Sequence, residues 1–282
     1  MKLALMIDAP NAIPGDSYVK VPTGPYKETL ALAAEMGFDG VEILIDHPDT
    51  NEFGALQEAA ARTGMEVAAI NSGRLYFDHG LGLVSEDADV REASRAALLA
   101  LAHQTALFKV PINIGVFRGL PAPENRADAA SQLMTILQET ADKVADIGVT
   151  LVLEPGNKFE FPFIYSTADG IALVEQAGRP NIALMLDTFH LSMENESLPN
   201  AFEVAMPLLR HIHFLDRQRN PPSNQSEDFD FIGVLQMLQR HNYQHFISMP
   251  LLQDGDITKT ADRIAALRTA ITNIENTEKE ND

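Results

Sequence analysis

Short apolar runs alternate along the chain with longer segments in which apolar residues recur at helical spacing. The runs predict eight strands, because charged residues are sparse within them, as is typical of strands covered on both faces. These strands are expected at 2–8, 40–45, 66–71, 111–117, 149–155, 182–190, 209–216 and 245–252. The intervening segments predict helices at about 24–37, 53–64, 87–108, 125–146, 167–177, 198–207, 229–241 and 257–276.

Strands and helices that alternate eight times over about 250 residues are typical of a single (β/α)8 TIM barrel, an α/β fold. An open doubly wound sheet is the competing interpretation, but the first strand is not followed by GxGxxG. Ser166 and Asp169 have the spacing of a capping box at the start of one predicted helix. We therefore expect a barrel over residues 1–276 and a polar, frayed C-terminal tail at 277–282.

Composition narrows the classes of function. The 282 residues include no cysteine, so a metal would need oxygen and imidazole ligands. The net charge of −19 argues against a nucleic-acid partner, because such binding depends on Lys and Arg. The first apolar run is too short for a signal peptide, and none approaches the roughly 20 residues of a membrane helix. We expect a cytoplasmic protein with no membrane partner.

Titratable residues at strand ends are the candidates for chemistry, because in a barrel these ends meet at one mouth. Glu154 follows the run VTLVL, Asp187 follows IALML, and His213 lies near the end of the seventh run. Such a set suits Mn²⁺, Mg²⁺, Co²⁺ or Zn²⁺. The alternative is a hydrogen-bonded structural cluster that closes the top of the barrel.

Other polar residues near the predicted mouth have more open roles. His211 shares a strand face with His213 and fits a core histidine. Glu42 lies on the second predicted strand, and His190 lies three residues past Asp187, where it could hydrogen-bond a substrate oxygen. Arg219 begins the long polar loop 217–228, which we expect to cover a substrate.

Three segments, LEPGNKFE (153–160), LDTFHLSME (186–194) and HIHFLDRQR (211–219), resemble motifs of the xylose isomerase-like barrel superfamily. The nearest branch is the sugar isomerases and ketose 3-epimerases of the D-tagatose 3-epimerase type. The segments GFDGVEI (37–43) and INIGVFRG (112–119) resemble that family's second and fourth strands. The resemblance covers nearly the whole chain.

This resemblance implies roles for individual residues. Glu154 matches the glutamate that binds the metal and exchanges a proton with the substrate, and Asp187 and His213 match two further metal ligands. The residues that match substrate-binding positions are Glu160, His190 and Arg219. Asn157 lies within the first motif without an assigned role.

The eighth strand departs from the family pattern. The family places a second catalytic glutamate, also a metal ligand, in a segment like ISxE. Here the strand reads FISMPLL, which puts Pro250 at that position, or Met249 if the register slips by one. Neither side chain can bind a hard cation or carry a proton. Asp254 follows shortly afterwards, but strand geometry disfavours its reaching back.

The leading hypothesis is a metal-dependent isomerase or epimerase acting on a sugar or sugar-like hydroxy-carbonyl compound through an enediolate, with Glu154 as base. A dehydratase of keto-polyols or dehydroshikimate needs only one base and is an alternative. A non-catalytic metabolite-binding relative is a second alternative. Apurinic-site endonucleases share the superfamily, but they use a denser cluster of histidines and acids for three zinc ions. Only eight histidines, few of them at strand ends, and the negative charge argue against that activity.

For an anionic substrate group the candidates are Lys158 and Arg118. Barrels of this kind often form homo-oligomers, and no apolar stripe identifies an interface.

Overall fold

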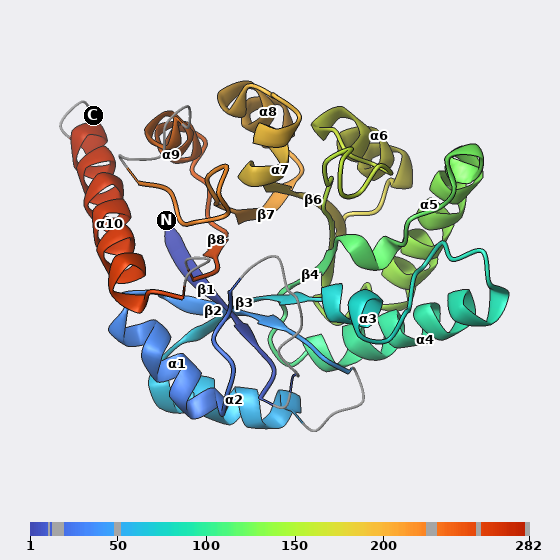
Figure 1. Ribbon diagram of the computed structural model, residues 1–282, viewed down its shortest axis with the longest axis horizontal. Coiled ribbons are helices and arrows are strands. Elements are labelled where there is room, and N and C mark those ends of the chain that lie inside the picture. Colours follow the sequence, from blue (N-terminus) through green and yellow to red (C-terminus); the bar gives the residue numbers. More distant parts are fainter. Residues whose placement is uncertain (11, 13–19, 48–51, 224–229, 252–254, 280–282) are drawn as a thin grey trace.

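Eight parallel strands close into a barrel in the order β1 to β8, with β8 paired to β1 (Figure 1). The structure is a computed structural model, and it describes residues 1–10, 12, 20–47, 52–223, 230–251 and 255–279. It confirms the predicted single (β/α)8 barrel. The strands are β1 (Lys2–Asp8), β2 (Gly40–Leu44), β3 (Glu66–Asn71), β4 (Pro111–Ile114), β5 (Thr150–Leu153), β6 (Ile182–Asp187), β7 (Leu209–His213) and β8 (Phe246–Met249).

Helices surround the barrel on its outside (Figure 1). The predicted helices correspond to α1 (Tyr26–Glu35), α2 (Glu52–Thr63), α4 (Ala88–Thr105), α5 (Arg126–Lys143), α6 (Thr167–Ala177), α8 (Leu198–Ala205), α9 (Phe231–Arg240) and α10 (Ile257–Lys279). The capping box at the start of α6 is confirmed, because Ser166 and Asp169 exchange hydrogen bonds. None of the helices in the described ranges is long and apolar enough to cross a membrane.

Several boundaries differ from the sequence prediction. The short helices α3 (Gly73–Phe77) and α7 (Thr188–Met193) were not predicted, and α7 replaces the expected last residues of the sixth strand. Two short 3-10 turns, η1 (Val116–Arg118) and η2 (Pro123–Asn125), follow β4. Helix α10 continues to Lys279, beyond the expected end at 276. Near its end Ile274 packs on the core and Glu275 accepts a hydrogen bond from the N-terminal amine at 3.0 Å. Residues 280–282 lie outside the described part of the chain.

Successive side chains of each strand point alternately toward the helices and toward the inside of the barrel. Leu3, Leu5 and Ile7 of β1 join the main core between strands and helices, and the other strands contribute in the same way. A smaller cluster of Val152, Ala183 and Met185 lies apart from that core. Polar residues of the strands, described below, gather above it at the C-terminal ends, where the chemistry of a TIM barrel is found.

The buried guanidinium of Arg118 joins the ends of two strands. It donates hydrogen bonds to the carbonyl oxygens of Gly115 (2.7 Å), Glu154 (2.9 Å), Phe163 (3.0 and 2.9 Å) and Ile164 (3.2 Å). Burial lowers the pKa of Arg118 to about 10, which leaves it charged at neutral pH. Because its donors are directed at backbone oxygens, Arg118 stabilises the loop after β5, and the sequence-based suggestion that it binds an anionic substrate group has no support in this geometry.

We predict that Arg118→Met lowers the free energy of unfolding by about 3 kcal/mol or more, because several buried carbonyls lose their donor. The matched control is Arg62→Met on α2, whose guanidinium is exposed and pairs with Glu58 one helical turn away. That change should cost less than about 1 kcal/mol. Urea unfolding followed by circular dichroism measures both. Equal midpoints for the two variants would contradict the role of Arg118.

Candidate metal and substrate site

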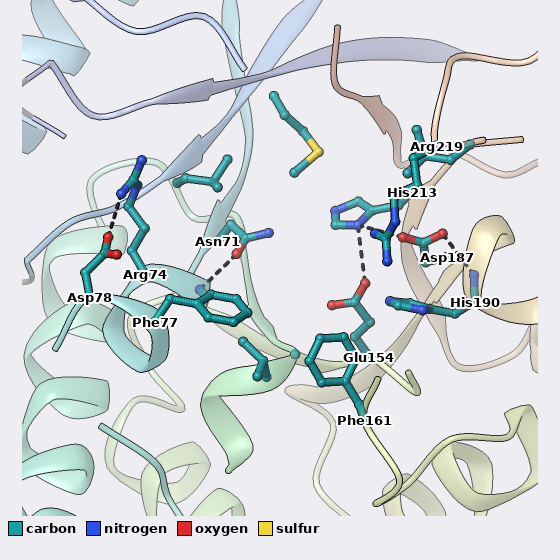
Figure 2. A pocket seen from close by; sticks show the side chains of 16 residues that line it. Asn71, Arg74, Phe77, Asp78, Glu154, Phe161, Asp187, His190, His213 and Arg219 are labelled. Atoms are coloured by element: carbon teal, nitrogen blue, oxygen red, sulfur yellow. Dashed lines mark hydrogen bonds and ion pairs between the residues drawn. The ribbon is translucent and has the colours of Figure 1, made fainter. Parts of the chain in front are cut away.

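The three predicted metal ligands come from consecutive strands and meet at the mouth of the barrel. Glu154 directly follows β5, Asp187 ends β6 and His213 ends β7. The Nδ1 atom of His213 lies 3.3 Å from Glu154 Oε1 and 3.6 Å from Asp187 Oδ2 (Figure 2). All three side chains are buried. The structure therefore brings together the residues that sequence reasoning selected.

Asp187 has a second function as the N-cap of α7. Its Oδ1 accepts hydrogen bonds from the backbone N–H groups of Phe189 at 2.7 Å and His190 at 3.4 Å. The strand therefore ends at Asp187 and a helix begins, since a capping carboxylate satisfies the free N–H groups of the first turn. The remaining oxygen, Oδ2, is the one that faces His213.

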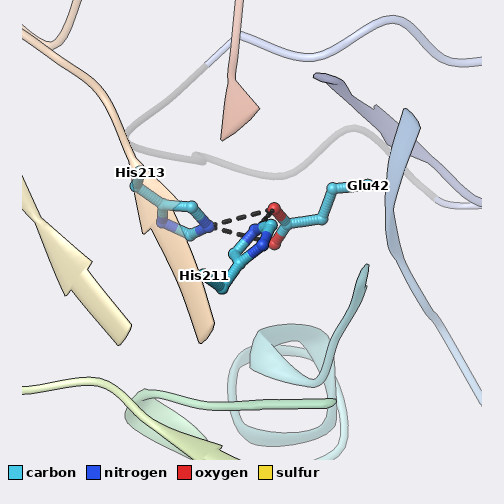
Figure 3. Close-up of side chains that lie close together, drawn as sticks. All are labelled: Glu42, His211 and His213. Atoms are coloured by element: carbon cyan, nitrogen blue, oxygen red, sulfur yellow. Dashed lines mark hydrogen bonds and ion pairs between the residues drawn. The ribbon is translucent and has the colours of Figure 1, made fainter. Parts of the chain in front are cut away.

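Behind His213 lies a buried glutamate on the opposite side of the barrel. Glu42 of β2 is fully buried, and its two oxygens lie 3.0 and 3.1 Å from His213 Nε2 (Figure 3). His211 Nε2 contacts the same carboxylate at 2.7 Å, and Asn71 donates to it at 3.0 Å. Sequence analysis placed Glu42 on β2 without a role. In the structure it orients His213, so that Nδ1 faces the mouth.

Two groups of ligand-capable side chains can be recognised among the described residues. One is Glu42, His211 and His213, and the other is Glu154, Asp187 and His190; within each, the candidate ligand atoms lie within 4.8 Å of one another. His213 connects its own group to the other one, because one ring nitrogen contacts Glu42 and the other faces Glu154 and Asp187.

The electrostatics of the cluster depend on its imidazoles. Burial by itself raises the pKa of Glu42, Glu154 and Asp187, but electrostatic attraction to the neighbouring imidazoles and hydrogen bonds from them outweigh burial and lower each pKa. Burial likewise acts to lower the pKa of His213, and the charge of Glu42 and hydrogen bonds to the three carboxylates raise it well above its ordinary value. A positive charge at this point allows three buried carboxylates to remain ionised.

The carboxylate of Glu154 is held closely from the β4 side. Asn113 donates to Glu154 Oε2 at 3.0 Å. A Cβ added to Gly115 would lie 2.4 Å from the same oxygen, which is too close. Glycine at 115 therefore leaves the space that the Glu154 carboxylate occupies. The one feature of the sequence that could have indicated this contact is the polar Asn113 inside the apolar run PINIGVF.

The three predicted substrate-binding residues lie together beside the ligand cluster. Glu160 and Arg219 form an ion pair with oxygen–nitrogen distances of 2.6 and 2.5 Å. The Arg219 guanidinium stacks 3.7 Å from the centre of the Phe189 ring. Asn157, which had no assigned role, contacts His190 Nδ1 at 2.8 Å and Glu160 Oε2 at 3.2 Å.

The loop after β7 places Arg219 through a local hydrogen-bonded turn. Asp216 Oδ1 accepts from the backbone N–H groups of Gln218 at 2.9 Å and Asn220 at 3.0 Å. Arg219 itself has a φ of 59°, in the left-handed region that costs a non-glycine residue free energy. Of the predicted covering loop 217–228, residues 224–228 lie outside the described part of the chain.

A cavity of about 370 Å³ lies between this cluster and an opposite wall. That wall carries Arg74, Phe77 and Asp78 from α3 and the residue after it, together with Asn71 (Figure 2). Arg74 forms a two-pronged ion pair with buried Asp8 at 2.7 and 2.6 Å and a further one with Asp78 at 2.5 Å. Sequence analysis missed this wall, although Asp8 and Asn71 are polar residues at the ends of apolar runs.

The eighth strand contributes no carboxylate at the family position. Met249 joins the core between strands and helices, whereas Ser248 pairs in register with His213. Alternation therefore assigns the inward-facing position after Ser248 to Pro250 rather than Met249. Asp254, named as a distant substitute, lies outside the described residues. Lys158 pairs with Glu194 at 3.0 Å and does not line the cavity.

Comparison with known proteins agrees with the motifs. Residues 30–271 match the family model described as xylose isomerase-like TIM barrel. A D-psicose 3-epimerase of Agrobacterium fabrum is 29% identical over 244 residues, which cover 82% of this chain and 80% of that protein. An L-ribulose 3-epimerase of Mesorhizobium japonicum is 28% identical over 232 residues, covering 79% and 74%.

A solved structure shows the same fold. The apo crystal structure of 3-keto-D-glucoside 4-epimerase from E. coli superposes with a TM-score of 0.76 at 20% identity, covering 95% of this chain and 100% of that one. The resemblance inferred from the sequence motifs is confirmed, and the chain belongs to the xylose isomerase-like TIM barrel family.

Proposed function

We propose that the protein is a divalent-metal-dependent isomerase or epimerase of a sugar or sugar-like hydroxy-carbonyl compound. The observation that carries the proposal is the meeting of Glu154, Asp187 and His213 at the mouth of the barrel, with His213 Nδ1 directed at both carboxylates. The activities named for the similar proteins, D-psicose and L-ribulose 3-epimerisation, support the substrate class.

The donor atoms fit a divalent ion. Two carboxylates and one imidazole nitrogen suit Mn²⁺, Mg²⁺, Co²⁺ or Zn²⁺, and His213 is oriented by Glu42 as metal-binding histidines commonly are. A bound ion would polarise the carbonyl of the substrate and stabilise the enediolate charge.

The remaining chemistry belongs to the side chains of the chain. Glu154 accepts the proton from the carbon beside the carbonyl, and its position is fixed by Asn113. Glu160, His190 and Arg219 hold substrate oxygens from the adjacent wall. Phe161, whose ring centre lies 5.7 Å from that of His190, lines the cavity and excludes water around these contacts.

The absence of a glutamate at the eighth-strand family position favours reactions that need one base. A 1,2-proton shift moves the proton from one carbon to its neighbour on the same face of the substrate, so a single base on that face, Glu154, can carry it. A relative named as a putative hydroxypyruvate isomerase, from Mus musculus, is 27% identical over 242 residues. Dehydration of a keto-polyol or of dehydroshikimate also begins with one proton abstraction and is the second candidate.

We predict that the purified protein carries a stoichiometric divalent ion and that Asp187→Ala and His213→Ala each abolish its retention. Each variant removes one of three ligands, and such losses lower metal affinity steeply. Elemental analysis after dialysis measures the ion, with exposed His103→Ala on α4 as control. Undiminished metal in both variants would overturn the assignment. No binding by the native protein in excess metal would favour a non-catalytic, metabolite-binding relative.

We predict that Glu154→Gln lowers turnover of a ketose substrate by at least about 100-fold, because the amide cannot accept the proton. The fold should be retained, since the amide occupies the same volume. Glu139→Gln, on the surface of α5, provides the matched control. The measurement is a ketose and dehydratase panel assayed with each candidate metal. Turnover that survives in Glu154→Gln would exclude Glu154 as the base.

A further inference from the structure

Two histidines at the mouth, His190 and His213, each have one ring nitrogen occupied by a buried neighbour. For His213 that neighbour is the carboxylate of Glu42, which contacts Nε2. For His190 it is the side-chain amide of Asn157, which contacts Nδ1 at 2.8 Å. The two neighbours differ in hydrogen-bonding character, because a carboxylate accepts whereas an amide can donate or accept.

The orientation of the Asn157 amide is fixed by the backbone. Its Oδ1 accepts hydrogen bonds from the N–H groups of Phe159 and Glu160, both at 3.0 Å. The opposite end of the amide must therefore be the NH₂ group, and it faces His190 Nδ1 and Glu160 Oε2. The Glu160 carboxylate oxygen can only accept, so the network is consistent only in this orientation, and His190 Nδ1 must accept from the same NH₂ group. Asn157 is fully buried, which excludes water as a substitute partner.

A donor at Nδ1 determines the tautomer of the neutral His190 ring. Since Nδ1 accepts from Asn157, its lone pair is occupied and the ring proton resides on Nε2. An Nε2–H group donates a hydrogen bond to a substrate oxygen but has no lone pair for a metal. His213 is arranged in the opposite way, because its Nε2 faces a carboxylate and its Nδ1 is left to face Glu154 and Asp187.

We infer that Asn157 is a positioning residue that holds His190 as an Nε2–H donor toward the substrate and prevents it from becoming a metal ligand. The inference deepens the proposed function and rests on it for the identity of the substrate. It resolves an ambiguity in the side chains themselves, since the His190 ring lies close enough to Glu154 and Asp187 to complete a ligand group with them. Asn157 also contacts Glu160, the partner of Arg219, and so connects all three substrate-binding candidates.

The test is the tautomer of His190, read from ¹⁵N chemical shifts of the full-length protein labelled at histidine nitrogens, with the signals assigned by their loss in His190→Gln. The native protein should show a protonated Nε2 and a bare Nδ1. In Asn157→Asp the isosteric carboxylate keeps its contacts with the backbone N–H groups but accepts from Nδ1, so the proton should move to Nδ1. Asn157→Ala, which removes the donor without adding charge, should give a mixture of the two tautomers.

The control is Asn181→Asp, whose amide donates to the Ala141 carbonyl far from the mouth and whose change should leave the His190 signals in place. A native His190 with its proton on Nδ1 would overturn the inference. So would a tautomer that is the same in the native protein, Asn157→Asp and Asn157→Ala.

Addition of Zn²⁺, which is diamagnetic, separates this inference from the proposed function. The expected result is that Zn²⁺ shifts the Nδ1 signal of His213 while His190 keeps its Nε2 proton. Loss of that proton on addition of Zn²⁺ would identify His190 as a ligand and overturn the inference. If Zn²⁺ leaves His213 unchanged, the metal site fails, whereas the tautomer comparison among the Asn157 variants still decides the role of Asn157.

Discussion

The carboxylates of Glu42, Glu154 and Asp187 are buried at the top of the barrel, and a single imidazole, that of His213, contacts all three. Like charges in a volume of low dielectric repel strongly unless positive charge or hydrogen-bond donors compensate them. Each carboxylate accordingly has its own donor besides His213. Asn71 donates to Glu42, Asn113 donates to Glu154, and backbone N–H groups of α7 donate to Asp187.

This constraint accounts for features that otherwise look unrelated. Glycine at 115 leaves space for an oxygen of Glu154, and Arg118 fixes the backbone on both sides of that carboxylate. Helix α7 begins at Asp187 because one of its oxygens caps the first turn. The cluster is therefore held by backbone elements as well as by side chains, as a preorganised site requires.

The sequence was sufficient to predict the eight strands, because strands covered on both faces are continuous apolar runs. It extended the sixth and seventh strands too far, since Phe189 in α7 and Phe214 and Leu215 in the loop after β7 are buried just as strand residues are. Helix α3, with five residues, is too short to produce a helical period. The three ligand candidates were predictable as polar residues that end apolar runs. The contact between Glu42 and His213 was not, because only closure of the barrel brings β2 opposite β7.

The ligand candidates come from β5, β6 and β7, whereas the wall across the cavity comes from β1, β2, β3 and the short helix after β3. The two walls come from opposite halves of the chain, and Asn71 links them, because it lines the cavity and donates to Glu42, which contacts His213. Substitutions at Phe77 or Asp78 can therefore reshape the cavity without touching the carboxylates of the other wall, whereas a change at Asn71 reaches His213 through Glu42. Such a division leaves one part of the cavity free to change during evolution while the ligand cluster stays constant.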